Sequence, residues 1–525
     1  MQLPAYQRLA RASDLADPKE RRIYRALEIM PGALSWGTLA AGVLCSWLFP
    51  VWTAFIITVF VVFWLFRLLY LGFHLAASYR QMRRNEKTDW AEELRTLPPD
   101  TYSLPISSWR DLYHLVVLPS YNESLDILRQ SLLSIRQNMY PAERILVVLG
   151  MEEREGREAE EKASILEREF GEAFFSFLIT KHPAELPDEI PGKASNETWA
   201  LRKAKEEVLD KKGILPERVI VTSLDADTVL SPQYLGCLTY HFLVAEDPLH
   251  VSFQPIPLFL NNVEEAPALS RVFAFNSTFW HTMNQQRPEK LISFSSHSMG
   301  LKALLDVGFK QPNVVSDDSR IFWQCFLYYD GNWRTQPLHC PVSMDANAAP
   351  TLWRTIQHIY LQQRRWAYGV ADVPYAFFGF FKNKKIPRRR AFALGGEILF
   401  GFWSWATASM LIFLLGWLPL LLGGGAFSQT LVSYNLPRFV SIMLRLAMLG
   451  VVGSMYLSIL LLPVDTSYGK KKKLFLVLQW FLLPLTMVAA SLPALEAQTR
   501  LMLGRYMGFW PTPKWRRPEA HRRTG

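Results

Sequence analysis

Two long hydrophobic runs dominate the start of the chain, at about 33–49 and 51–75. Each run reaches the roughly 20 residues that a membrane-spanning helix needs. Pro50 stands between them, so the pair is predicted to form a tight helical hairpin. The preceding residues 1–32 are basic and amphipathic, a pattern typical of a helix that lies on a membrane surface.

Between 76 and 352 the pattern changes, because charges return and short apolar runs alternate with amphipathic stretches. The strand-like runs are Leu115–Pro119, Arg144–Leu149, Phe174–Ile179, Val219–Leu224 and His250–Gln254. Strands that alternate with helical stretches are typical of a mostly parallel sheet. This part is therefore predicted to be an α/β domain.

The C-terminal third is apolar again. It comprises an amphipathic stretch at 353–393, a hydrophobic region at 394–495 with runs at about 394–422, 439–463 and 474–495, and a basic tail at 496–525. The last run contains Pro484 and Pro493, which break or kink helices. Three full crossings would put the basic tail on the side opposite the basic N-terminus, against the positive-inside rule. We therefore expect the last run to be broken or re-entrant, or one further span to be present.

Composition supports a membrane location. Half of the 525 residues are hydrophobic, and charged residues make up only 20%, below the quarter usual for soluble domains. Within the net charge of +10, basic clusters such as Arg388–Arg390 and Lys470–Lys473 adjoin apolar runs. This placement favours a lipid bilayer as partner, with the central domain cytosolic at the plasma membrane. No nucleic-acid-binding motif occurs, so no nucleic-acid partner is expected.

Two carboxylates one residue apart, Asp225 and Asp227, follow the strand-like run at 219–224. Clustered acids repel one another unless a cation relieves them. Carboxylates combined with substrate phosphates are the usual site of Mg²⁺ or Mn²⁺. The alternative is a helix-capping Asp and a turn Asp ahead of Pro232.

Two further polar segments follow apolar stretches. Tyr121 and Glu123 lie where the first strand turns into a helix, the position at which open α/β sheets bind ligands. Asp317 and Asp318 precede an amphipathic helix. One of them could be a general base and the other a helix cap.

A third candidate is the group Gln362, Arg365 and Trp366 in the amphipathic stretch. Such a basic, aromatic helix is often only an interfacial anchor. It also suits a sugar-phosphate site, because Arg neutralises a diphosphate, Gln binds hydroxyls and an indole packs on a sugar ring.

In this order the motifs resemble those of the family 2 inverting glycosyltransferases, in the membrane branch of cellulose and hyaluronan synthases. The resemblance implies a GT-A-like, Rossmann-like mixed sheet inserted between N- and C-terminal transmembrane helices. It implies that Asp225 and Asp227 form the D-x-D motif, with Asp227 on the metal, and that Asp318 is the catalytic base. The segment 362–366 matches Q-x-x-R-W, which implies acceptor contact for Trp366 and donor contact for Gln362 and Arg365.

Other positions match this family less closely. The segment 509–514 resembles its F-x-V-T-x-K gating loop, which implies that Thr512 and Lys514 close over the nucleotide. Lys193 lies in a segment similar to G-K-x-x-x-N near the nucleotide, and Tyr121 and Glu123 are expected beside it. Asp317 and Ser298 are expected near the acceptor. In this family an acid after the second strand usually contacts the base of the nucleotide. Glu152-Glu153 stands at that place and matches the family pattern only loosely.

The sequence thus predicts a membrane-integrated hexosyltransferase that uses a nucleotide-sugar donor, Mg²⁺ or Mn²⁺, and a glycan or lipid-linked acceptor. Inverting, processive polysaccharide synthesis is expected. Two alternatives stay open: transfer of one sugar to a lipid or lipid-linked acceptor, and an inactive membrane scaffold or assembly subunit.

Overall fold

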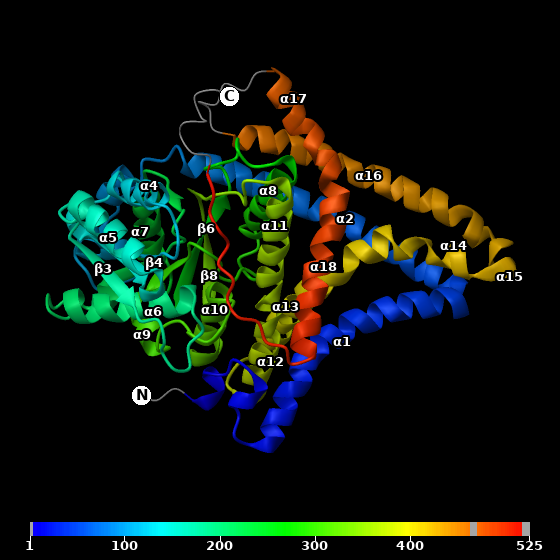
Figure 1. Cartoon of the computed structure of the whole chain (residues 1–525), viewed down its shortest axis with the longest axis horizontal. Coiled ribbons are helices and arrows are strands. Elements are labelled where there is room, and N and C mark those ends of the chain that lie inside the picture. Colours follow the sequence, from blue (N-terminus) through cyan, green and yellow to red (C-terminus); the bar gives the residue numbers. More distant parts are fainter. Residues whose placement is uncertain (1–3, 463–469, 517–525) are drawn as a thin grey trace.

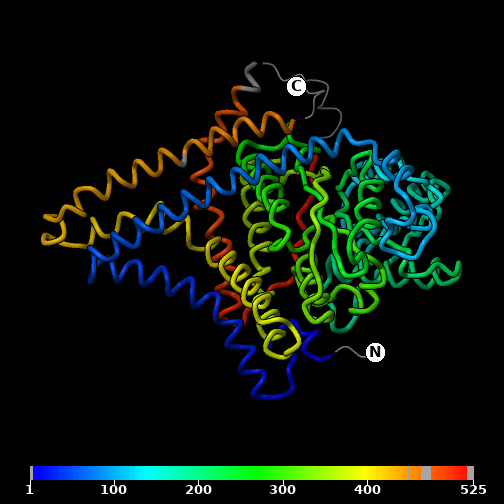
Figure 2. The backbone as a smooth tube through the Cα atoms, turned by 180° about the vertical axis from the view of Figure 1, so that it is seen from behind, coloured from blue at the N-terminus to red at the C-terminus, as the bar shows by residue number. Residues whose placement is uncertain are grey.

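The computed structural model describes residues 4–462 and 470–516. An α/β domain lies at one side and long apolar helices extend from it toward the other (Figures 1 and 2). Among the described residues, eight strands form one mixed sheet in the order β3-β2-β1-β4-β7-β6-β8-β5. Their bounds are β1 (Tyr113–Pro119), β2 (Ile145–Glu152), β3 (Ser176–His182), β4 (Val219–Ser223), β5 (Val229–Leu230), β6 (Val251–Leu258), β7 (Ser298–Gly300) and β8 (Arg334–Ser343).

Strands β3, β2, β1 and β4 pair in parallel, and β7 is antiparallel to both β4 and β6. Strands β1, β2 and β4 are continuous apolar runs because helices cover both of their faces. One face is covered by α4 (Leu125–Arg136), α5 (Arg157–Phe170) and α7 (Tyr234–Val244). The other is covered by α6 (Lys193–Ala204), α9 (Leu301–Asp306) and α10 (Asp317–Tyr328). The predicted α/β domain is therefore present, and its sheet is mixed, as expected.

Within the described residues, five helical segments are long and apolar enough to cross a membrane: α1 (Pro18–Leu48), α2 (Pro50–Asn85), α13 (Arg388–Phe413), α16 (Leu431–Leu461) and Leu474–Met502. Only 11% of the most apolar window of α2 is buried inside the protein. Large apolar side chains such as Phe55 and Ile56 are exposed there. An exposed apolar surface of this extent is typical of contact with lipid.

The first helix begins earlier than the hydrophobic run indicated. Helix α1 starts at Pro18 because the Asp17 side chain accepts a hydrogen bond from the Lys19 backbone and proline suits a first helical position. Helix α2 continues to Asn85, ten residues beyond the end of the run at 75. Residues 18–32 thus belong to the same continuous helix as the first hydrophobic run.

The run at 474–495 is interrupted by a 3-10 turn next to Pro484, whereas Pro493 lies inside a continuous helix. Helix α17 (Lys470–Leu478) ends in a 3-10 turn at Gln479–Leu482, and α18 (Leu483–Met502) follows. In Figure 1, α18 runs across the direction of α2 and α16. It hydrogen-bonds α1 through Gln498 and Ser35, and α13 through Ser491 and Ser409.

The amphipathic stretch forms α11 (Leu352–Ala367), a 3-10 turn and α12 (Asp372–Lys382). Helix α11 is joined to α18 by Glu496, which accepts hydrogen bonds from Tyr360 Oη and Arg364 Nη1. The helix that carries residues 362–366 is thereby held between the sheet domain and the apolar helices.

Candidate active site

The two acids after β4 lie at the carboxyl edge of the sheet, and each is held by a lysine. Asp225 accepts a hydrogen bond from Lys193 Nζ at 2.7 Å and one from Ser295 Oγ at 2.8 Å. Asp227 is fully buried and accepts from Lys514 Nζ at 2.7 Å and from the Asp345 backbone at 2.8 Å. Asp225 and Asp227 therefore belong to a cluster of ion pairs and do not only shape a turn.

The second acid pair opens α10 beside the same lysine. Lys193, the first residue of α6, lies 3.0 Å from Asp318 Oδ2. The buried Lys310 reaches Asp318 Oδ1 at 2.9 Å and Asp317 Oδ2 at 3.2 Å. Since Lys193 contacts both Asp225 and Asp318, the two acid motifs, 93 positions apart in the sequence, share one counter-ion.

A buried glutamate completes this cluster. Glu197 is paired with Lys310 and accepts a hydrogen bond from Ser223 Oγ at 2.7 Å. Burial alone would raise the pKa of Asp318, but Lys193 and Lys310 hold it well below its usual value. Burial dominates at Glu197, whose pKa is raised. Two lysines thus keep Asp318 ionised.

Tyr121 and Glu123 lie beyond β1 at the same edge. Glu123 accepts hydrogen bonds from the Tyr121 backbone at 2.6 Å and from Ser120 Oγ at 3.0 Å. Burial raises its pKa to about 7. The Arg154 guanidinium lies 3.9 Å from the centre of the Tyr121 ring, and Arg154 Nε donates to Glu152 at 3.2 Å. A planar aromatic face and a half-buried acid therefore lie at this edge of the sheet.

Helix α11 brings Arg365 to the acid cluster and Trp366 to a neighbouring cavity. Arg365 is half-buried near Asp225, Asp317 and Asp318, and its charge interacts with all three. Its guanidinium lies 4.9 Å from the centre of the Phe509 ring. Trp366 and Gln362 line a narrow cavity together with Asp345. The structure thus supports proximity of the helix to the acids.

The C-terminal tail passes over this site. Phe509 packs against Gly192, where an added Cβ would approach Phe509 to 2.7 Å. Thr512 Oγ1 is buried without a hydrogen-bond partner among the described residues. Lys514 reaches Asp227, and Arg516 binds Asp345 with Nε at 3.0 Å and Nη2 at 2.6 Å. The tail therefore supplies two cations to the edge where β4 ends.

The acids fit a divalent cation that shares its coordination with a substrate. Within the described residues, no group of three or more His, Cys, Asp or Glu side chains is arranged to hold a metal. Asp227 Oδ1 is nevertheless buried without a hydrogen-bond partner among those residues. Mg²⁺ is often bound through one or two carboxylates plus substrate phosphates. Asp227, with Asp225 beside it, offers such a donor set.

Ser298, expected near the acceptor, lies elsewhere. It belongs to β7 inside the sheet, and its hydroxyl pairs with Thr222 Oγ1 at 2.9 Å and with Tyr234 Oη at 3.4 Å. Those partners occupy it, and no contact joins it to the acid cluster in the described part of the chain. An alternative position from that loop is Ser295, which contacts Asp225.

Lys310, Glu197 and Arg516 were not singled out by the sequence. Glu197 follows Lys193 by one helical turn, a spacing that places both on one face of α6. That spacing is a usable signal for Glu197. Lys310 lies in an irregular loop and Arg516 in the tail, so only the folded chain shows their partners.

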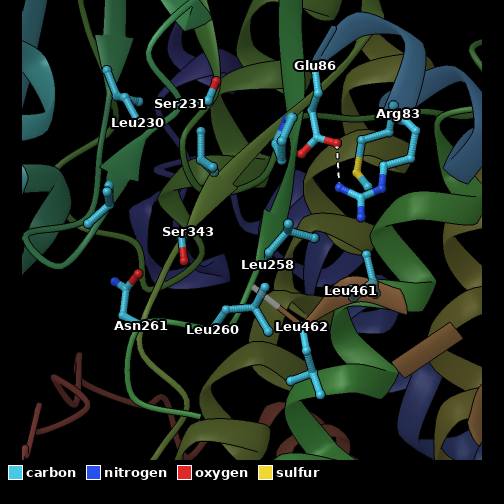
Figure 3. Close-up of a pocket in the computed structure, with 14 residues that line it drawn as sticks. Arg83, Glu86, Leu230, Ser231, Leu258, Leu260, Asn261, Ser343, Leu461 and Leu462 are labelled. Atoms are coloured by element: carbon cyan, nitrogen blue, oxygen red, sulfur yellow. Dashed lines mark hydrogen bonds and ion pairs between the residues drawn. The ribbon is translucent and has the colours of Figure 1, made fainter. Parts of the chain in front are cut away.

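A larger cavity, of about 480 Å³, lies on the other side of the D-x-D loop (Figure 3). It is lined by the end of α2, the end of α16 and strands β5, β6 and β8. One wall carries the Arg83–Glu86 ion pair and another carries Asn261. Asn261 Nδ2 donates to the Asp227 carbonyl at 2.8 Å. The cavity thus adjoins the acids without being lined by them.

No protein-family model matches the chain, and no curated protein matches it. Among solved structures it is similar to a mannosyltransferase from Pyrobaculum calidifontis in complex with GDP-Man and Mn²⁺, at 14% identity and a TM-score of 0.42, over 86% of this chain and 100% of that one. It is also similar to GalNAc-T7 with UDP, GalNAc and Mn²⁺, at 11% identity and a TM-score of 0.32, over 55% of this chain and 57% of that one.

A third similar structure is S. aureus TarS 1-349, at 12% identity and a TM-score of 0.27, over 66% of this chain and 92% of that one. At these identities and TM-scores the similarity does not assign the chain to a family. Its function is therefore proposed below from the arrangement of its own residues.

Proposed function

We propose that the chain is a membrane-embedded glycosyltransferase that moves a sugar from a nucleotide-sugar donor to an acceptor hydroxyl with inversion. The observation that carries this proposal is the meeting of Asp225, Asp318 and Lys193 at the carboxyl edge of the sheet. Acids from two distant segments that share one lysine provide both a donor-phosphate site and a base.

The donor diphosphate is proposed to lie between the lysines and the D-x-D acids. Lys193, Lys514 and Arg365 supply positive charge around this position. Asp227, with Asp225, would hold Mg²⁺ or Mn²⁺, and a bound cation would neutralise charge on the leaving diphosphate. Thr512 Oγ1, without a partner among the described residues, is available to a phosphate oxygen. We place the base of the nucleotide next to Tyr121 and Glu152.

Transfer is proposed to be a single displacement. The acceptor oxygen forms a bond to the anomeric carbon while the bond from that carbon to the diphosphate breaks. Asp318 takes the acceptor proton, and the nucleoside diphosphate leaves. Lys193 is expected to shift from Asp318 toward the donor phosphates, because they offer a stronger anionic partner. The Asp318 carboxylate then loses one counter-ion and becomes more basic.

The acceptor is either a growing glycan or a lipid-linked molecule. A glycan and processive synthesis are supported by the indole of Trp366 on α11, which suits packing against a sugar ring. A lipid-linked acceptor is supported by cationic residues where the apolar helices meet the sheet domain, described below. The length of the product separates these two candidates.

The direct test is a donor screen with the purified full-length protein and Mg²⁺ or Mn²⁺, in which released nucleoside diphosphate and product size are measured. At least one nucleotide sugar is expected to release its diphosphate. Absence of release from every donor, in the presence of lipid and glycan acceptors, would support the inactive-scaffold alternative.

A further inference from the structure

We infer that Arg67, Arg287 and Lys290 form a binding site for the phosphate group of a lipid-linked acceptor. This inference rests on the proposed function, and it names the chemical class of the acceptor. It starts from three cationic side chains that gather around a single carboxylate, Glu397, at the junction of α2, α13 and the segment after α8 (Ala268–Asn284).

The ion pairs of this cluster leave positive charge in excess. Arg287 Nη2 lies 2.9 Å from Glu397 Oε1, and Lys290 Nζ lies 3.0 Å from Glu397 Oε2. Both carboxylate oxygens are thereby occupied. The Arg67 charge interacts with those of Glu397 and Arg287. The neighbouring Glu289 is exposed and forms no ion pair within the described part of the chain.

Two guanidinium donors in the cluster have no acceptor. Arg67 Nε and Arg287 Nε are both buried without a hydrogen-bond partner among the described residues. Arg287 is only 6% exposed. The Arg67 guanidinium instead lies over aromatic rings, 4.8 Å from the centre of Phe400 and 5.5 Å from that of Trp64. A buried unsatisfied charged donor is costly, so a ligand that accepts from both groups would stabilise the cluster.

The depth of the cluster matches that of lipid phosphates. Arg67 is 17 residues from the start of α2, and Glu397 is 16 residues from the end of α13. At 1.5 Å per residue each lies about 25 Å from the helix end remote from the sheet domain. A hydrocarbon core is about 30 Å thick. Both residues are therefore near its inner boundary, where basic pockets between helices bind lipid head groups.

The segment that carries two of the cations continues into the catalytic cluster. Three residues after Lys290, Ser293 Oγ donates to the Asp318 carbonyl at 2.7 Å. Ser295 Oγ donates to Asp225. Phe294, between them, packs edge-on against the half-exposed Trp280, with ring centres 5.0 Å apart. This continuity favours an acceptor lipid over a bulk lipid, because a phosphate held by the cations would lie on the segment that reaches the proposed base.

A purely structural role explains the Glu397 pairs, and for Arg67 it extends only to the packing of the guanidinium on Phe400 and Trp64. The pairs with Arg287 and Lys290 already fasten the segment to α13. Arg67 lies near the lipid boundary and forms no ion pair among the described residues. Its charge therefore costs desolvation energy without an ion pair that fastens two elements together. Intramembrane ionisable residues of this kind are usually functional, and arginine is well suited to phosphate recognition.

The test compares Arg67→Gln with Arg80→Gln in the full-length protein reconstituted into phosphatidylcholine nanodiscs. Arg80 is an exposed arginine on the same helix, bonded only to its own backbone turn. The probes are polyprenyl phosphate, phosphatidylglycerol and inorganic phosphate, and bound lipid is quantified by native mass spectrometry. Arg67→Gln leaves both Glu397 pairs in place, so the fold is expected to survive, and Arg67→Lys serves as a charge-conserving rescue.

Wild type, Arg80→Gln and Arg67→Lys are expected to bind polyprenyl phosphate, whereas Arg67→Gln loses about tenfold or more in affinity. Equal binding by Arg67→Gln and wild type would overturn the site. Equal, Arg67-dependent binding of phosphatidylglycerol, or Arg67-dependent binding of inorganic phosphate alone, would overturn the assignment to an acceptor lipid. Donor-dependent diphosphate release is measured in the same samples with the lipid and glycan acceptors of the donor screen present. Its absence in wild type would refute the proposed function and not the lipid site.

Discussion

At the scale of single residues, the candidate site depends on lysines that hold carboxylates in the charged state. Lys193 bridges Asp225 and Asp318, and Lys310 bridges Asp317 and Asp318. Like charges this close would otherwise favour protonation of one member. The ionised carboxylates can therefore bind a cation or accept a proton, and the charged lysines can bind a phosphate group.

Replacement of Asp318 by Asn tests its role as base. The amide cannot accept the acceptor proton, so kcat is expected to fall by about 10² to 10⁴-fold. The donor dissociation constant should change little, because Asp318 is proposed to act on the acceptor. Steady-state kinetics and equilibrium donor binding measure the two effects separately. Turnover that stays within a few fold of wild type would remove Asp318 as the base.

Glu123 provides a prediction about pH. Burial raises its pKa to about 7 from 4.5, so the folded protein binds this proton more tightly than the unfolded chain does. That stabilisation is complete below the unfolded pKa and is lost as pH rises through about 7. The wild type is therefore expected to lose thermal stability relative to Glu123→Gln between about pH 5 and about pH 8. Parallel melting curves across this range would contradict the prediction.

At the scale of elements, the site is assembled from a strand end, two helix starts and the tail. Asp225 and Asp227 follow β4, Lys193 opens α6, and Asp318 lies in the first turn of α10. The tail then crosses between α6 and α11, with Phe509 against Gly192 and beside Arg365. Elements from all parts of the chain must therefore pack correctly before the acids meet.

Gly192→Ala tests whether the tail must occupy this position. An added Cβ would lie 2.7 Å from Phe509, so the tail must shift. The backbone there is extended and tolerates alanine. Donor KM is expected to rise about tenfold, because Lys514 and Thr512 move with the tail. Gly37→Ala, with open space around the new Cβ, is the matched control. Equal donor KM in both variants would show that the tail is not part of the donor site.

Local patterns were sufficient for the main elements and for the acid pairs. Apolar runs predicted β1, β2 and β4 because a strand buried on both faces is continuously hydrophobic. The same patterns missed β7, which has three residues and is defined by its neighbours. Ser298 was accordingly placed near the acceptor, although the sheet buries its hydroxyl. Lys310 was missed because its partners come together only on folding.

At the scale of the whole molecule, α18 decides on which side of the bilayer the C-terminal tail lies relative to the sheet domain. In Figure 1 it runs across the direction of α2 and α16. If only α1, α2, α13 and α16 cross the bilayer, the sheet domain and both termini share one side. That arrangement agrees with the positive-inside rule for the basic tail.

Labelling of introduced cysteines tests this topology, because Cys237, Cys325 and Cys340 are buried. In a Cys45→Ser background, cysteines at Glu185, Arg505 and Ser428 report on the sheet domain, the tail and the α15 (Gly424–Ser428) turn. The first two are expected to react with a membrane-impermeant maleimide only in inverted vesicles, and the third only in right-side-out cells. Reaction of Arg505→Cys from the same side as Ser428→Cys would show that α18 crosses the bilayer.

Asp227 and Asp318 are proposed to serve one catalytic site, with Asp227 acting on the donor and Asp318 on the acceptor. The most direct test of this central claim is equilibrium binding of the active donor, or a non-hydrolysable analogue, with and without Mn²⁺ in wild type, Asp227→Asn and Asp318→Asn. We predict that Mn²⁺ strengthens binding to wild type and to Asp318→Asn, while Asp227→Asn loses this enhancement. An identical Mn²⁺ response in all three proteins, or no Mn²⁺ response in wild type, would contradict the account.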